Sequence, residues 1–140
     1  MKKLKLVALI LITGLAIYAC SSSKENASEV SKTLVGDWKV QWITYPDKNA
    51  PANDSINYTM NGEMNIKGDG KITINAYGYQ NCIFGTDTLI HTLNWDLPSD
   101  SVLNLTNDGD KYGIPYSILD LSENKVKLQL VEDVYLFLTK

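Results

Sequence analysis

The side chains with the most reactive chemistry in this sequence are one histidine and two cysteines. His91 is the only imidazole, so a serine, threonine or cysteine nucleophile would have no other histidine to activate it. The sequence contains no nucleophile elbow, no phosphate-cradling glycine loop and no paired carboxylates on one strand face. We therefore expect no catalytic residue and no enzymatic activity.

Metal binding has equally few candidate ligands. One histidine and one free cysteine on separate segments do not make a four-ligand zinc site. The segment Asn107-Asp108-Gly109-Asp110 lacks the spacing and the terminal glutamate of an EF-hand, and tight turns select the same residue types. We expect a turn there, and neither a metal nor a cofactor. Cys82 lies beside Ile83 and Phe84, which favours a small buried side chain over a reactive or intermolecular thiol.

The N-terminal segment has the order of a signal peptide: basic, then apolar, then small. Three lysines precede an apolar run over residues 6–18, and Ala19 follows it. This run has 13 residues, whereas a membrane-spanning helix needs about 20. Ile17-Tyr18-Ala19-Cys20 resembles the lipobox of bacterial lipoproteins, which implies that residues 1–19 are removed and that Cys20 is acylated. The alternative is an ordinary secretory signal with an incidental cysteine.

Acylation at Cys20 would anchor the protein in a membrane by its N-terminal lipid. The resemblance therefore predicts a lipid-anchored protein of the cell envelope, in the outer membrane of a Gram-negative bacterium. Without the three signal lysines the chain has 10 lysines, no arginine and 16 acidic residues, a net charge of −6. An acidic, arginine-free chain is a poor partner for phosphate backbones, so we expect no nucleic-acid binding.

Residues 20–33 are mostly polar, and we expect a flexible tether there, with one helical turn near Val30 and Leu34. From residue 34 to 140 the hydrophobic pattern alternates with period two, and polar turns interrupt it. The pattern predicts eight strands, with a Gly/Asp hairpin at 67–71 and a bulge near Ile118. Short turns between consecutive strands favour an all-β, eight-stranded antiparallel up-and-down barrel as one domain over 34–140.

The segment Leu34–Val40, LVGDWKV, resembles the opening Gly-x-Trp signature of lipocalins. The strand with Trp95 and the strands that follow it resemble the lipocalin-like domains of small bacterial lipoproteins. This resemblance implies that Gly36 and Trp38 lie at the closed end of the barrel, with Trp38 across its floor. It also implies that the loop 45–55 partly covers the open mouth. Lipocalins place an arginine of the last strand over that tryptophan, and this chain has no arginine.

Eight-stranded barrels are either filled by their own side chains or hold one small ligand. Side chains of the inward parity could line such a site, and they are Trp42, Tyr58, Met60, Met64, His91 and Trp95. For His91 three interpretations are open: a core residue, a group that orients a ligand or, least favoured, a catalytic residue. We expect a small hydrophobic or amphipathic ligand. The alternative is a filled barrel that docks an envelope protein or a glycan through its outward aromatics, which are Tyr77, Tyr79, Tyr135 and Phe137.

Overall fold

The computed structural model describes residues 27–46, 49 and 56–140 of the chain. Residues 1–19, Cys20 and most of the loop 45–55 lie outside the described residues, so the expected signal peptide and lipidation site do too.

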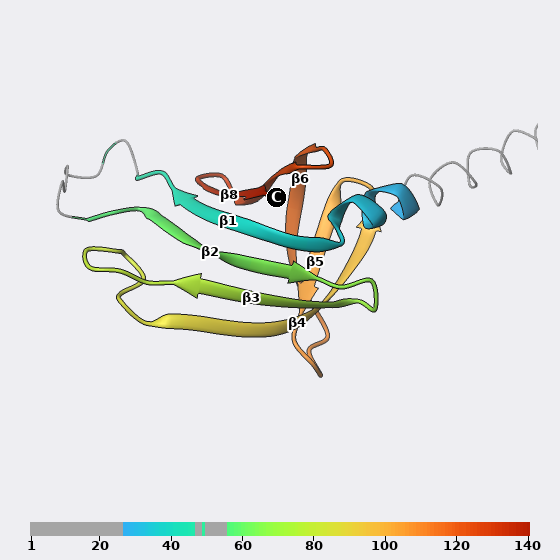
Figure 1. Ribbon diagram of the computed structural model, residues 1–140, viewed down its shortest axis with the longest axis horizontal. Helices are drawn as coiled ribbons and strands as arrows, with labels where there is room; N and C mark the ends of the chain where they lie inside the picture. Colours follow the sequence, from blue (N-terminus) through green and yellow to red (C-terminus); the bar gives the residue numbers. More distant parts are fainter. Residues whose placement is uncertain (1–26, 47–48, 50–55) are drawn as a thin grey trace, which may run out of the picture.

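The described chain forms eight β-strands that close into a barrel (Figure 1). Every pairing between neighbouring strands is antiparallel; each strand pairs with its neighbour in the chain, and the last strand pairs with the first. The strands are β1 (Gly36–Thr44), β2 (Thr59–Ile66), β3 (Lys71–Tyr77), β4 (Thr88–Ser99), β5 (Val102–Thr106), β6 (Ile114–Leu121), β7 (Lys125–Val131) and β8 (Val134–Thr139). The eight predicted strands and the closed antiparallel barrel are thus confirmed.

The alternation of the sequence determines which side chains fill the barrel. Trp38 on β1 pairs with Met64 on β2, which pairs with Ile74 on β3, so these three side chains share the inner face. Their sequence neighbours Lys39 and Glu63 lie on the outer face. One end of the barrel is packed solid by buried apolar side chains, which include Leu34, Trp38, Met64, Ile66, Ile72, Leu103, Leu128, Leu136 and Leu138.

Two predicted irregularities are confirmed. The β2–β3 hairpin closes through a backbone hydrogen bond from Lys67 to Lys71, and Gly70 has φ = 85°. The register of β6 and β7 shifts between Ile118 and Asp120, which is the expected bulge. β4 continues through Pro98 to Ser99. The pairing of β4 with β5 shifts register between Asp96 and Ser99. Because the regular hydrogen bonding is interrupted there, the N–H that Pro98 lacks is not needed.

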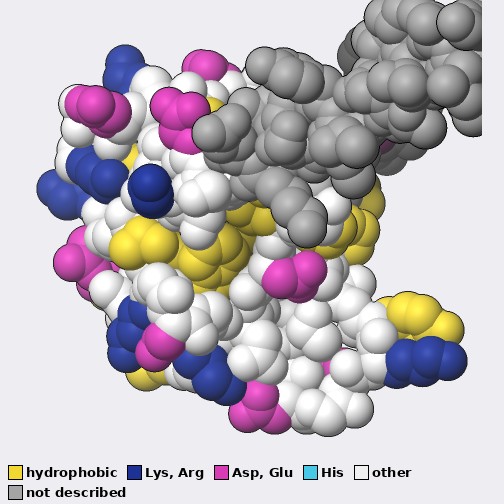
Figure 2. All heavy atoms as spheres, turned by 90° about the vertical axis from the view of Figure 1, so that its right-hand side faces the viewer, with side chains coloured by type: hydrophobic (Ala, Val, Ile, Leu, Met, Phe, Trp, Pro, Cys, Tyr) yellow, Lys and Arg dark blue, Asp and Glu magenta, His cyan; other side chains and the backbone are white. Residues whose placement is uncertain are grey.

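A short helix over residues 27–34 precedes β1 and packs on the closed end of the barrel. Leu34 is fully buried and Val30 packs against the core, because the helix turns these two side chains, four residues apart, to the same face. The structure therefore differs from the tether expected over 20–33, of which residues 27–33 are helical. Figure 2 looks onto this end and shows an apolar strip among interspersed lysine and acidic side chains.

Candidate functional site

The barrel has a closed end and an open end, and its open half is incompletely walled. We call the inner face of this half the mouth. Its side chains come from the ends of β1 and β3, from the residue before β2 and from the first halves of β2, β4 and β6. They are Trp42, Tyr58, Met60, Ala76, Leu89, His91, Leu93 and Ile114.

The mouth is open because two neighbouring strands differ greatly in length. β4 has 12 residues and β5 has only five, and the pairing between them begins at Asn94. The first half of β4 therefore has no strand beside it to continue the wall (Figure 1). As a result Leu89 is 43% exposed although it lies on the inner face, opposite the buried Ala76. Ile114, opposite the buried Leu105, is 51% exposed.

Trp42 lies between the mouth and the packed floor, and Gly62 makes room for it. A methyl group at Gly62 would lie 2.8 Å from Cζ3 of the Trp42 ring and 2.1 Å from the backbone oxygen of Asn75. Only a glycine therefore lets the indole lie against β2 at this position. Trp42 itself is half-buried and packs against the core cluster.

The six predicted lining residues divide between the two halves of the barrel. Trp42, Tyr58, Met60 and His91 belong to the mouth, whereas Met64 and Trp95 belong to the floor. The Trp95 indole donates a hydrogen bond of 2.8 Å to the Lys67 carbonyl oxygen, which fixes it below the β2–β3 turn. The floor residues are buried in the apolar cluster described above.

His91 has the predicted orientation but not the predicted enclosure. It pairs with Ile74 on the inner parity, and yet its side chain is exposed because no strand covers this part of β4. The interpretation of His91 as a buried core residue is therefore wrong. Its interpretation as a polar group that orients a ligand stays a prediction. Half-buried Tyr116 is another polar inner-face residue, and burial raises the pKa of its phenol.

Sequence reasoning did not find Leu89, Ile114 and Tyr116 as candidate ligand contacts. Leu89 and Tyr116 follow the inward parity of their strands, but parity gives only the face of a residue and not its height in the barrel. The signal in the sequence was a difference in strand length: the alternating run over 88–97 is long, whereas the apolar run at 103–105 is short.

A hairpin over residues 78–87 forms part of the rim of the mouth. The Asn57 amide donates to the Asn81 carbonyl oxygen over 2.6 Å, and the Ile83 amide donates to the Asn57 carbonyl oxygen over 3.2 Å. A groove of about 550 Å³ lies beside this junction, and Tyr58 is one of its walls. The same hairpin contains Cys82, whose side chain is partly buried and accepts a hydrogen bond from the Phe84 amide at Sγ.

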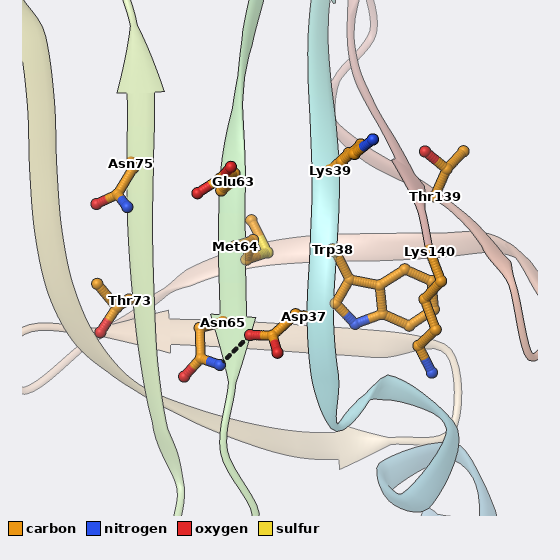
Figure 3. A pocket seen from close by; sticks show the side chains of 10 residues that line it. All are labelled: Asp37, Trp38, Lys39, Glu63, Met64, Asn65, Thr73, Asn75, Thr139 and Lys140. Atoms are coloured by element: carbon orange, nitrogen blue, oxygen red, sulfur yellow. Dashed lines mark hydrogen bonds between the residues drawn. The ribbon is translucent and has the colours of Figure 1, made fainter.

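At the closed end, a lysine side chain lies over Trp38. Trp38 is buried and donates an indole hydrogen bond of 2.7 Å to the Leu34 carbonyl oxygen, which ties the short helix to β1. The Lys140 Nζ lies 4.3 Å from the centroid of the Trp38 ring. Figure 3 shows this pair beside a groove of about 330 Å³, which outward polar side chains of β1, β2 and β3 line, including Lys39 and Glu63.

The outward aromatics form separate groups rather than one surface. Tyr135 and Tyr45 meet edge to face at 5.8 Å, and Lys127 lies over the rings of both Tyr135 and Phe137. These four residues line a groove of about 500 Å³. Tyr77 is separated from Phe137 by two strands, β1 and β2, in the register.

The acidic segment 107–110 is a turn, as expected. The Asp110 amide donates to the Asn107 carbonyl oxygen, and Gly109 has φ = 89°. Asp108 forms an ion pair of 3.1 Å with Lys71. Among the described residues, no group of three or more histidine, cysteine, aspartate or glutamate side chains is arranged to hold a metal ion.

The structure is a small β-barrel with exposed apolar side chains on its inner face at one end, at Leu89 and Ile114. No protein-family model, curated protein sequence or solved structure matches the chain. In the part of the chain that the structure describes, no helix has the length and apolar character needed to cross a membrane.

Proposed function

We propose that this chain is a non-enzymatic, lipid-anchored protein of the cell envelope that binds a small hydrophobic or amphipathic molecule in a lipocalin-like barrel. The observation that carries the proposal is the exposed apolar inner face of the mouth, at Leu89 and Ile114. Apolar side chains that face the interior of a barrel are normally covered, and an apolar ligand would cover these.

The mouth has the composition of a small-molecule site, with mainly apolar walls and few polar groups. Trp42 offers a flat ring at the base, and Met60 offers an adaptable thioether beside it. Tyr58 and His91 supply polar atoms near the rim, which would orient the polar end of an amphipathic ligand. Each 100 Å² of apolar surface removed from water would contribute about 2.5 kcal/mol before the costs of association.

The closed end supports the lipocalin-like assignment. The resemblance places Trp38 on the floor beneath a cation from the last strand, and Lys140 follows β8 directly. Its ammonium group over the Trp38 ring supplies the positive charge for which the chain has no arginine. Consecutive pairing of all eight strands is also the order of an up-and-down barrel.

The anchor part of the proposal rests on Cys20 and the segment that precedes it. Expression of Cys20→Ser in a Gram-negative host, followed by membrane fractionation and mass spectrometry, tests it. We expect the unchanged chain to carry acyl mass and to fractionate with outer membranes, and the variant to lose both properties. A variant that remains in membranes, together with an unchanged chain without acyl mass, would refute the anchor.

A second candidate function is docking of an envelope protein or a glycan on the outer face. The groove at Tyr45, Tyr135 and Phe137 favours it, because aromatic rings under a lysine offer stacking and cation–π contacts to a partner. This function would need no ligand in the mouth, so the two candidates make different predictions for mouth variants.

The experiment that separates them compares two Leu→Lys variants of residues 21–140. Leu89→Lys places a charge in the mouth, and Leu119→Lys makes the same change on β6 at an outward bulge position that is similarly exposed, at 48%. Binding of an uncharged apolar fluorescent probe such as Nile red is measured by titration.

We expect saturable binding that Leu89→Lys weakens about tenfold and Leu119→Lys leaves unchanged. Recovering about half of a leucine burial is worth about 1.4 kcal/mol, which is this factor of ten. Equal affinities for both variants, or no saturable binding over a panel of fatty acids and sterols, would contradict a ligand site in the mouth.

A further inference from the structure

The first half of β4 has a free edge. Residues 88–93 pair with β3 along their whole length, but the pairing with β5 begins only at Asn94. Among the described residues, no other segment makes backbone hydrogen bonds to the open side of 88–93. In Figure 1 this part of β4 forms the lower margin of the layer of β1 to β4. A strand edge of this kind can accept another strand.

The register shows which backbone groups are free. The Trp95 amide donates to the Gly70 carbonyl oxygen, and the Gly78 amide donates to the Asp87 carbonyl oxygen. Odd-numbered residues of β4 therefore direct their backbone groups toward β3, and even-numbered residues direct theirs to the other side. Thr88, Ile90 and Thr92 consequently present three N–H and three C=O groups at the free edge.

The devices that normally protect an edge are missing from this segment. Natural sheets guard their edges with lysines, prolines, bulges or a covering loop. The sequence of 88–93, TLIHTL, contains no proline and no lysine or acidic residue, and its pairing with β3 has no bulge. At its centre Ile90 is 68% exposed on the outer face of the barrel. The segment has the properties of a strand that pairs with another one.

We propose that the occupant of this edge is a second copy of the chain, which pairs β4 with β4 antiparallel about a two-fold axis at Ile90. In this register Ile90 lies opposite Ile90 of the other copy, and Thr88 lies opposite Thr92. All six free backbone groups of each copy are then paired, because every facing residue is even-numbered. Other registers leave some of them unpaired.

Charge favours this edge over the other faces for contact between two copies. The chain has a formal net charge of −3, so two copies repel each other at long range. The segment 88–93 carries no formal charge when His91 is neutral, and it lets the backbones approach without like-charge contact. The exposed Ile90 and two Thr–Thr pairs add side-chain contacts across the axis.

The proposed pairing also connects the two mouths. Leu89 of each copy would lie opposite His91 of the other, on the inner face of the joined sheet. Two strands of this length cover less than a standard interface of about 1,600 Å², so the dimer is weak and forms where copies are concentrated. The pairing does not depend on a ligand in the mouth.

Disulfide trapping of the full chain in intact cells tests the register. All variants carry Cys82→Ser, and this parent without a new cysteine measures the background from Cys20. Opposite residues of an antiparallel pair have Cα atoms about 5.5 Å apart, which a disulfide can bridge. Oxidation of Ile90→Cys should give a dimer on non-reducing gels well above the parent. Thr88→Cys alone should not, because its two copies are offset by four residues, about 13 Å.

Co-expression of differently tagged Thr88→Cys and Thr92→Cys chains should restore the dimer as a mixed species. Tyr112→Cys is the control for random collision, since this residue is 77% exposed and lies away from the edge. Trapping of Ile90→Cys no greater than that of Tyr112→Cys would overturn the proposal. Trapping of Thr88→Cys alone as efficient as the mixed pair would overturn it as well. Neither result depends on ligand binding.

Discussion

Replacing Gly62 by alanine tests whether a missing side chain on β2 holds Trp42 at the base of the mouth. The added methyl group would lie 2.1 Å from the Asn75 backbone oxygen and 2.8 Å from Trp42, whereas ordinary contacts begin near 3.4 Å. Both the β2–β3 spacing and the indole must therefore shift. Overpacking of this kind costs about 1–3 kcal/mol, and alanine regains only about 0.5–1 kcal/mol of the glycine penalty in a strand.

The spacing change is the larger effect because the obstacle includes backbone, so we expect a net loss of about 2 kcal/mol. For a domain of this size that corresponds to a Tm lower by roughly 8 °C. The assay is thermal unfolding by circular dichroism, together with tryptophan emission. The control is Gly68→Ala in the β2–β3 turn, where an added methyl group meets nothing within 4 Å. If Gly62→Ala has the same Tm and the same tryptophan emission as the unchanged chain, Gly62 does not hold Trp42 in place.

Two further predictions concern charges at the surface of the barrel. Lys140→Ala removes the cation over Trp38 and should lower the free energy of unfolding by about 0.5–1 kcal/mol in denaturant titrations. The control is Lys111→Ala, which removes a cation over the exposed Tyr112 and should change the free energy of unfolding less. Equal effects of the two substitutions would contradict a specific role for the pair of Lys140 and Trp38. The pKa of the Asp108 carboxyl is lowered from 3.8, first because it accepts a hydrogen bond from Asn94. The stability that this carboxylate contributes is thus fully present above about pH 4, and it is lost as the pH falls through the lowered pKa of the folded state. Asp108→Asn should therefore show a shallower fall in Tm below about pH 4, and parallel pH profiles would contradict this prediction.

Much of the fold could be predicted because a period of two is a local property of the chain. Residues such as Trp38 and Met64 alternate with charged neighbours, and each strand reveals its buried face without any knowledge of its partners. The bulge near Ile118 was visible as a change of parity. The helix over 27–34 was only partly predictable, since its polar residues resemble a linker and only the contacts of Val30 and Leu34 reveal its packing.

The shape of the mouth could not be predicted from parity. His91 and Leu89 share their face with Trp95, and they differ from it in exposure because β5 ends before it reaches them. Strand length relative to a neighbour depends on register, which the turns and the core determine together. The place of Gly62 beneath Trp42 is likewise a cross-strand property, which single-strand patterns do not contain.

The most direct test of a ligand site in the mouth is quenching of Trp42 by a brominated fatty acid, because bromine quenches indole only at short range. We expect saturable quenching of residues 21–140, and Trp42→Phe should remove it. Trp38 and Trp95 in the packed floor should contribute little, since both are buried. Quenching that is absent, or that persists undiminished in Trp42→Phe, would contradict ligand binding in the mouth of the barrel.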